Sequence, residues 1–314
     1  MQYIFILRIE AEKSNLSIED KTLGNWRYSW NNNIITAITY GSSAVRRNLG
    51  ATFEELETPQ KLGLLVDALT FCSDLCISAK INYDLFELTS GINIEDTSRT
   101  FAATLSEIIK NKKVENGSST DEWPIRINPG TSNTFSTEKI EIVKFLLDAF
   151  SKVNFVNTKI KLLSYWRRGF DLNELTYWDE SFLACFKILE FFEKQYCRGK
   201  NKLIDKRIKL VKTGNRKKAL KIGGGVNLPV VDNFLVKLLS DAINVRNNFD
   251  IAHMRIRPLP QERNGALYFT YYDQIWDLHD DLLELTRFFI LKYFGVKGVG
   301  LKGDGGLLKP YLPS

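Results

Sequence analysis

The feature of this sequence that most constrains its fold is a change of periodicity near residue 136. Ser136-Thr137-Glu138-Lys139 opens a run in which apolar residues recur at helical spacing: Ile140, Val143, Leu146, Leu147 and Phe150. Serine is a favoured N-cap, and this spacing places the apolar side chains along one face of a helix. The same pattern predicts helices over residues 158–170, 176–197, about 232–254 and about 272–294. We therefore expect an all-α helical bundle over residues 137–296.

Residues 1–40 have a different residue pattern, which is typical of strands. Met1–Ile9 and Trp26–Tyr40 are rich in β-branched and aromatic residues, and Asn31–Asn33 has the composition of a turn. Three aromatic residues alternate along the second segment, as the half-buried face of a sheet requires: Trp26, Tyr28 and Trp30. Base stacking is the alternative role for these rings. We expect them to belong to a sheet.

Two helices are expected between this sheet and the helical bundle. Thr58-Pro59 predicts a helix start, and the helix is expected to continue through KLGLLVDALTFCSDLCISAKI. A second helix is expected over Asp96–Asn111. The polar residues that follow contain turn-forming glycines and prolines and predict a domain boundary. The expected organisation is α+β: a smaller mixed α/β N-terminal domain (residues 1–111), a linker (112–136), the helical domain (137–296) and a flexible glycine-rich tail (297–314).

Composition favours a soluble, cytoplasmic protein. The 314 residues are 44% hydrophobic and 12% aromatic, which is enough to bury one or two cores without disulfides. The four cysteines are too scattered for a disulfide framework, and we expect reduced, mostly buried thiols: Cys72, Cys76, Cys185 and Cys197. The N-terminus lacks the pattern of a signal peptide, and no stretch has the roughly 20 apolar residues of a membrane span. No membrane partner is expected.

Positive charge is concentrated in one basic strip, residues 198–221. The strip holds eleven Lys or Arg against one acid: Arg198, Lys200, Lys202, Lys206, Arg207, Lys209, Lys212, Arg216, Lys217, Lys218 and Lys221, with Asp205. Its net charge of +10 leaves −4 for the rest of a chain whose total is +6. Such a strip beside a nearly neutral body predicts a polyanion partner, because each neutralised phosphate releases counterions. A solvated linker is the other interpretation.

Arg246 and His253 form the pattern that most directly indicates chemistry. They are seven residues apart, so a helix brings them to within roughly 20° of each other, two turns apart. An apolar stripe lies just to one side of their line: Leu235, Leu238, Leu239, Ala242, Val245, Phe249 and Ala252. Asp250 lies to the other side. The pair is therefore expected at the rim of a buried face.

This pair suits RNA cleavage by attack of the 2′-hydroxyl on the adjacent phosphate. The reaction needs a group that titrates near neutral pH and a cation to stabilise the phosphorane, and it needs no metal or cofactor. Histidine supplies the first and arginine the second. Asn247 and Asp250 are candidates to orient the phosphate and the imidazole. The structural alternative is an Arg246–Asp250 pair one turn apart with a core histidine.

The segment around this pair resembles the HEPN family. Arg246 is followed by Asn247, with six residues before His253, as in the family's hallmark motif. The preceding LLSYWRRGFDLNELTYWDESFLACFKILEFFEKQYC, which contains Glu190, is similar to the paired helices of the Apea-like branch. DQIWDLHDDLLELTRFFILKYFGV is similar to the helix that ends those domains. The likeness covers residues 137–296.

The resemblance implies a homodimer in which two Arg/His pairs face one cleft. Active members are endoribonucleases of toxin or antiviral-defence type; the alternative is a non-catalytic HEPN module serving as an RNA- or protein-binding subunit of a larger defence complex. The N-terminal domain would then have a sensor or regulatory role. An inhibitor or sensor protein is a further expected partner. Toxin members paired with nucleotidyltransferase antitoxins carry a tyrosine two residues after the histidine, where this chain has Arg255. We expect Arg255 and Arg257 to contact phosphates, together with residues of the basic strip: Lys206, Arg207, Lys209, Lys212, Arg216, Lys217 and Lys218.

Three other patterns favour structure over chemistry. Gly298–Gly303 matches the dinucleotide fingerprint, but it follows a predicted helix and precedes none. Cys72 and Cys76 lack a second pair of zinc ligands. Four polar residues of the closing helix are expected on its solvated side rather than around a metal, opposite a core of Ile275, Leu278, Leu282 and Leu285: Asp277, His279, Asp280 and Asp281.

Overall fold

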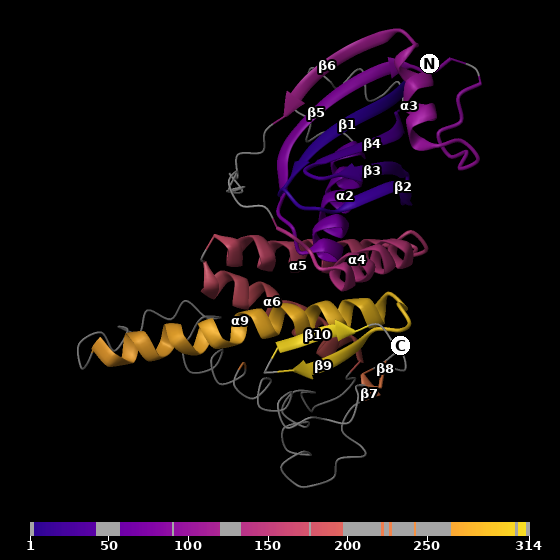
Figure 1. Ribbon diagram of the computed structural model, residues 1–314. Coiled ribbons are helices and arrows are strands. Elements are labelled where there is room, and N and C mark those ends of the chain that lie inside the picture. The colour runs from indigo at the N-terminus through magenta and orange to yellow at the C-terminus, as the bar shows by residue number, and fades with distance from the viewer. Residues whose placement is uncertain are drawn as a thin grey trace. The chain divides into compact units, whose positions relative to one another are not determined.

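The structure is a computed structural model of the chain. It describes residues 3–41, 57–89, 91–119, 133–175, 177–196, 221–222, 226–227, 242, 265–304 and 307–311. The chain divides into two compact units, Met1–Ile160 and Lys161–Ser314. An antiparallel sheet occupies the first unit and most helices follow later in the chain, so the expected mixed α/β composition is confirmed (Figure 1).

The N-terminal unit is built on a six-stranded antiparallel sheet with the order β2-β3-β4-β1-β5-β6. The strands are β1 (Tyr3–Ala11), β2 (Ser17–Leu23), β3 (Trp26–Asn31), β4 (Ile34–Gly41), β5 (Ile77–Glu87) and β6 (Lys113–Ser119). The central strand β1 pairs with β4 on one side and β5 on the other. Gly24 and Asn32 take positive φ angles, and these left-handed positions allow the tight turns from β2 to β3 and from β3 to β4.

Both faces of the central strand are buried, which explains its unbroken apolar sequence. On one face, Ile4 and Ile6 pack with Phe101 and Ile108 of α3 (Phe101–Ile109). On the other, Tyr3 and Phe5 pack with Leu85. The predicted sheet aromatics Trp26, Tyr28 and Trp30 are all at most 2% exposed. Their burial confirms the sheet interpretation and leaves no ring surface for stacking on bases.

Helix α2 (Glu57–Ser73) is shorter than the sequence predicts. It was expected to continue through Ile81, but Asp74 takes a φ of +57°, which ends the helix, and residues from Ile77 onward pair with β1 as β5. The prediction was wrong there because a long-range strand pairing overrides the local helical spacing. The other expected helix of this region, Asp96–Asn111, begins later, at Phe101 with Thr100 as its N-cap.

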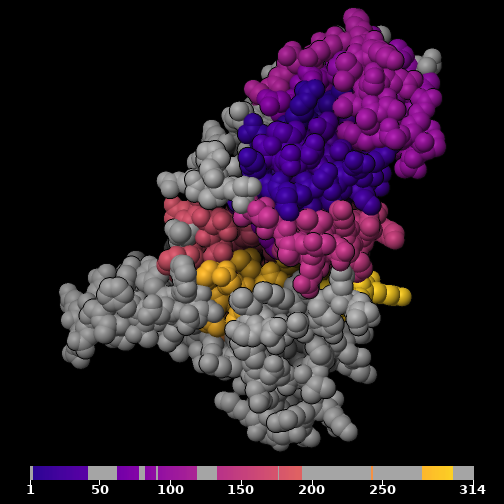
Figure 2. Space-filling view, in the orientation of Figure 1, coloured from indigo at the N-terminus to yellow at the C-terminus, as the bar shows by residue number. Residues whose placement is uncertain are grey.

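Helix α4 (Thr137–Phe150) begins at the predicted Ser136 cap, whose side chain accepts a hydrogen bond from the Lys139 amide. It belongs to the N-terminal unit, where it contacts α2 and β2. Phe150 stacks on Phe71 with ring centroids 5.4 Å apart. Lys21 forms a 2.5 Å ion pair with Asp148. In Figure 2 the surface of α4 is continuous with that of the indigo strands.

The division of the chain therefore differs from the expected one. Residues 112–136 were expected to be a linker, but Lys113–Ser119 form the edge strand β6 beside β5. The units divide after residue 160 rather than before residue 137. The physical reason is the packing of α4: its apolar face is buried against α2, so it is part of the first core.

The described part of the C-terminal unit includes three long helices. They are α5 (Asn157–Glu174), which crosses the boundary between the units, α6 (Trp178–Tyr196) and α9 (Gly265–Tyr293). These bounds agree with the predicted helices, although α9 begins earlier than expected. Gly169 lies against α6, where a Cβ atom would be 3.2 Å from the Cys185 Sγ, so glycine permits the close approach of α5 and α6 (Figure 1). Phe192 packs on Phe289 of α9 at 5.6 Å.

Short strands are also described in this unit. β7 (Lys221–Ile222) pairs with β8 (Val226–Asn227). The expected flexible tail instead contains an antiparallel hairpin of β9 (Gly300–Asp304) and β10 (Leu307–Tyr311), and β10 contacts α9. The glycine content of this tail disfavours a helix, as predicted, but it does not prevent an extended hairpin. No helix within the described ranges combines the length and apolarity needed to cross a membrane.

Candidate functional site

The predicted catalytic residues Arg246, Asn247, Asp250 and His253 lie outside the described residues. The predicted RNA-binding residues lie outside them too: Arg255, Arg257, Lys206, Arg207, Lys209, Lys212, Arg216, Lys217 and Lys218. Their arrangement stays a prediction. Of the basic strip, residues 198–221, the structure describes Lys221 alone, which begins β7.

The chain that carries the predicted pair connects two helices that pack together. α6 ends at Tyr196 and α9 begins at Gly265, and the two helices are in contact. Aromatic rings form part of that contact, with Phe191 and Tyr293 edge to face at 5.9 Å. Between the helices, Ala242 is described as helical and fully buried. Ala242 belongs to the predicted apolar stripe, but the other residues of the predicted helix lie outside the described ranges, so that helix and its phase stay a prediction.

The described part of the C-terminal unit buries several polar groups along α9. Arg287 is 2% exposed; its guanidinium carbon lies 5.7 Å from the Trp166 ring centroid, and its Nη1 donates to Glu284 Oε1 at 3.4 Å. The Trp166 indole N–H donates to the Leu283 carbonyl at 3.0 Å. The indole therefore links α5 to the backbone of α9, and the buried guanidinium lies against its ring.

A second buried arginine lies on α5. Arg167 Nε donates to Asp171 Oδ1 at 2.6 Å, one helical turn away. Burial raises the pKa of Asp171, and the neighbouring Arg167 only partly opposes this effect. Asp171 is therefore protonated more readily than an exposed aspartate. Both residues belong to α5, so the pair links successive turns of one helix.

His279 is the histidine that sequence reasoning misplaced. It was expected on the solvated side of the closing helix, but it is 4% exposed, and Asp281 is also buried. Its Nε2 lies 3.1 Å from Asp280 Oδ1, and its ring is 6.4 Å from that of Trp178. The hydrogen bond with His279 lowers the pKa of Asp280. The error has a physical cause: from Leu278 to Leu291 nearly every residue of α9 is buried, so the helix has no wide solvated side there.

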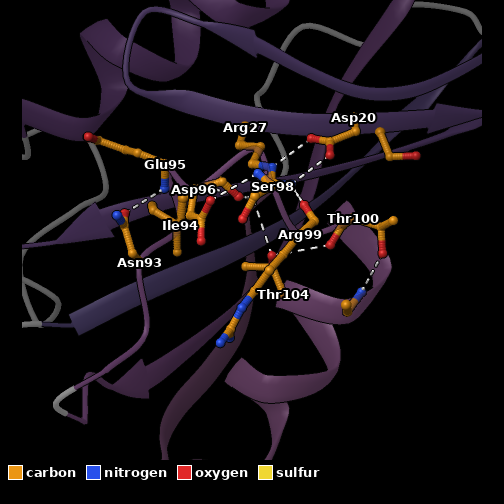
Figure 3. Close-up of polar contacts among 12 residues, drawn as sticks. Asp20, Arg27, Asn93, Ile94, Glu95, Asp96, Ser98, Arg99, Thr100 and Thr104 are labelled. Atoms are coloured by element: carbon orange, nitrogen blue, oxygen red, sulfur yellow. Dashed lines mark hydrogen bonds and ion pairs between the residues drawn. The ribbon is translucent and has the colours of Figure 1, made fainter.

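The N-terminal unit has its own polar centre, around Arg27 of β3 (Figure 3). Asp20 binds this guanidinium with both carboxylate oxygens, each at 2.6 Å, and these hydrogen bonds raise the pKa of Arg27. The remaining N–H groups donate to four acceptors in the segment before α3 and in its first turn: the carbonyls of Ile94, Asp96 and Arg99, and the Thr104 hydroxyl.

All N–H donors of Arg27 are occupied within the N-terminal unit. A guanidinium has five N–H donors, and each of the three nitrogens of Arg27 has at least one internal acceptor, with six bonds in all. No donor is left for a ligand. Arg27 is therefore a structural anchor that fixes the segment 94–100 and the first turn of α3 to the sheet. No local pattern in the sequence indicates this role, because these acceptors lie 67 to 77 residues away along the chain.

Metal and thiol chemistry find no support in the part of the chain that the structure describes. No group of three His, Cys, Asp or Glu side chains there is arranged to hold a metal ion. Cys72, Cys76 and Cys185 are buried thiols that form no disulfide, as expected, whereas Cys197 lies outside the described residues. Burial raises the pKa of the Cys185 thiol to about 12, so this cysteine is a poor nucleophile.

No protein-family model, curated protein or solved structure matches this chain. The resemblance to the HEPN family therefore depends on the Arg246–His253 motif and on the order of the helices around it.

Proposed function

We propose that this protein is a metal-independent endoribonuclease of the HEPN type that uses Arg246 and His253. The spacing of these two residues carries the proposal, because a helix would bring a guanidinium and an imidazole to one side, two turns apart. The described Ala242 supports that phase: at 100° per residue from this buried position, His253 lies about 20° away and Arg246 about 40° away. On such a helix both would lie on the same side as the buried Ala242, so the proposal requires a cleft that opens onto that side.

The proposed reaction balances with these groups alone. The 2′-oxygen attacks the adjacent phosphorus as an imidazole accepts its proton, and the bond from phosphorus to the 5′-oxygen breaks. A second imidazole, from the partner subunit of the proposed dimer, returns a proton to that 5′-oxygen. The products are a 2′,3′-cyclic phosphate and a 5′-hydroxyl. Arg246 would stabilise the charge on the phosphorane, and Asn247 and Asp250 would orient the phosphate and the imidazole.

The test is cleavage of a mixed-sequence RNA by the purified protein in EDTA, with the product ends analysed for the cyclic phosphate. We expect His253→Ala and Arg246→Ala each to lower the rate by a factor on the order of 10²–10⁴. Added imidazole should partly restore cleavage by His253→Ala, whereas Arg246→Lys should keep part of the rate because it keeps the charge.

The chain has only two histidines, so the control is direct. His279→Gln replaces the other imidazole, in the buried contact with Asp280, and should retain the limb of the pH–rate profile between about pH 5 and 8. His253→Ala should lose that limb. Undiminished cleavage by a folded His253→Ala protein would refute the proposal. RNA binding with no cleavage under any condition would favour the alternative, a non-catalytic HEPN module.

A further inference from the structure

An exposed stripe on α5 combines positive charge with an aromatic ring. Lys161, Tyr165 and Arg168 follow one another at spacings of four and three residues, so they lie along one side of the helix, and all three are exposed. Tyr165 is 41% exposed. The opposite side of α5 holds the core residues: Leu162, Leu163, Trp166 and Phe170. Tyr165 is therefore an aromatic residue that the core does not use.

A third cation reaches this ring from α6. The Nζ of the exposed Lys187 lies 5.8 Å from the centroid of the Tyr165 ring, over its face. The contact is possible because Gly169 lets α5 approach α6 closely. Cations from both helices therefore lie near the ring, with Lys161 about 6 Å and Arg168 about 4.5 Å away along the axis of α5. We call Lys161, Tyr165, Arg168 and Lys187 the α5–α6 platform.

No residue that the structure describes neutralises the charges of the platform. Neither Lys161, Arg168 nor Lys187 forms an ion pair with any described residue. The neighbouring Arg167 behaves oppositely, since it is buried and bonded to Asp171 at 2.6 Å. Arg167 and Arg168 are adjacent in α5 but have different environments. Arg167 is buried in the packing, whereas Arg168 faces solvent with its N–H donors available.

We propose that the α5–α6 platform binds single-stranded RNA, with Tyr165 stacked on a base and the three cations in contact with phosphates on either side. This deepens the ribonuclease function proposed above, on which the choice of RNA as the polyanion rests. An exposed ring flanked by cations is the arrangement that single-strand binding uses, because every base has a face to stack and every nucleotide a phosphate. A duplex fits less well, because its bases are already stacked on one another.

The ring is tested with the full-length His253→Ala protein, which keeps the probe intact. The measurement is the fluorescence anisotropy of a labelled oligouridylate of about 12 nucleotides in EDTA. We expect Tyr165→Ala to weaken binding about tenfold or more and Tyr165→Phe to keep it within about twofold, because the phenyl ring still stacks. The matched control is Tyr177→Ala: Tyr177 is a 55% exposed tyrosine of the same unit, but it lies near Glu174, Asp179 and Glu180 in sequence. It should leave the affinity unchanged.

The cations are tested by the salt dependence of the same binding. Replacing Lys161, Arg168 and Lys187 together with glutamine should reduce the slope of log Kd against log salt by about two, at about 0.7 for each lost phosphate contact. A control triple variant replaces three exposed lysines of the N-terminal unit and should keep the slope: Lys110→Gln, Lys144→Gln and Lys152→Gln. Equal losses in both triple variants would show attraction by general charge and overturn the platform.

The experiments distinguish failure of the RNA-binding platform from failure of the proposed ribonuclease activity. If wild-type protein binds the oligonucleotide through Tyr165 but never cleaves RNA, the platform stands and the catalytic proposal falls. If RNA is cleaved while Tyr165→Ala changes neither the binding nor the KM for cleavage, the catalytic proposal stands and the platform falls. Absence of both binding and cleavage overturns both.

Discussion

The Arg27 centre and the α5–α6 platform show two opposite uses of positive charge. At the centre one guanidinium is 2% exposed and all its nitrogens donate to acceptors of the same unit. On the platform three cations surround a 41% exposed ring and form no ion pair with any described residue. The difference lies in whether the donors are already occupied inside the protein. Occupied donors stabilise a fold, and exposed donors without an internal partner are available to an external anion.

Removal of Arg27 should destabilise the N-terminal unit strongly. Arg27→Ala should lower the free energy of unfolding of the N-terminal unit by about 3–5 kcal/mol, because Asp20 and three backbone carbonyls lose a buried charged partner. Arg27→Lys should recover little, since an ammonium cannot bind the carboxylate with two parallel bonds. Urea unfolding followed by hydrogen exchange of peptides from β1 to β5 measures this unit separately.

Arg8 provides the control for that experiment. It is also an arginine of the sheet, paired with Asp84 at 2.8 Å, but its side chain is 45% exposed. Arg8→Ala should cost no more than about 1 kcal/mol. Similar losses for Arg8→Ala and Arg27→Ala would contradict the view that burial, rather than pairing alone, decides the role of these cations.

Asp84, a buried carboxylate, gives a second test of whether burial decides how much an ion pair contributes to stability. Burial alone would raise its pKa, but hydrogen bonds from Lys113 at 2.5 Å and Arg8 at 2.8 Å reverse the effect and lower the pKa below its usual 3.8. A carboxylate whose pKa is lower in the folded state stabilises the fold above its unfolded pKa, and this stabilisation is lost as the pH falls through the folded pKa. Asp84→Asn should therefore cost about 1–2 kcal/mol at neutral pH.

The pH dependence distinguishes this effect from a packing defect. The cost of Asp84→Asn should be constant down to about pH 4 and should shrink at lower pH, where the wild-type carboxylate also becomes protonated. Asp148→Asn is the control, because Asp148 forms one ion pair, with Lys21, and its side chain is 51% exposed. It should change the free energy of unfolding by less than about 0.5 kcal/mol. A cost of Asp84→Asn that is equal at pH 3 and pH 7 would rule out the electrostatic explanation.

Local sequence patterns predicted the elements whose stability is local. Helix α4 begins at its predicted cap, and Trp26, Tyr28 and Trp30 alternate into a buried face as expected. The errors share a cause, which is long-range contact. Residues 77–81 have helical spacing in sequence but pair with β1, and the burial of His279 follows from packing around α9 that its own helical periodicity does not show.

The two candidate functional regions differ in the same way. The Arg246–His253 pair could be proposed from spacing alone, because both residues belong to one predicted helix. The α5–α6 platform could not, because Lys187 joins Tyr165 from another helix and the exposure of Arg168 against the burial of Arg167 depends on how α5 packs. A sequence shows where charges occur, and the fold decides which of them face the solvent.

Removal of the three platform cations should leave the stability of the protein nearly unchanged. Replacing Lys161, Arg168 and Lys187 together with glutamine should change the free energy of unfolding by less than about 0.5 kcal/mol. Lys187 loses its weak attraction to the Tyr165 ring, but the removal of repulsion among three nearby like charges offsets that loss. Three charges would then matter less to stability than the single charge of Arg27, although the same variant should bind RNA with a much weaker dependence on salt. A decrease of several kcal/mol in the free energy of unfolding, measured in urea, would instead show that these cations stabilise the fold, as Arg27 does.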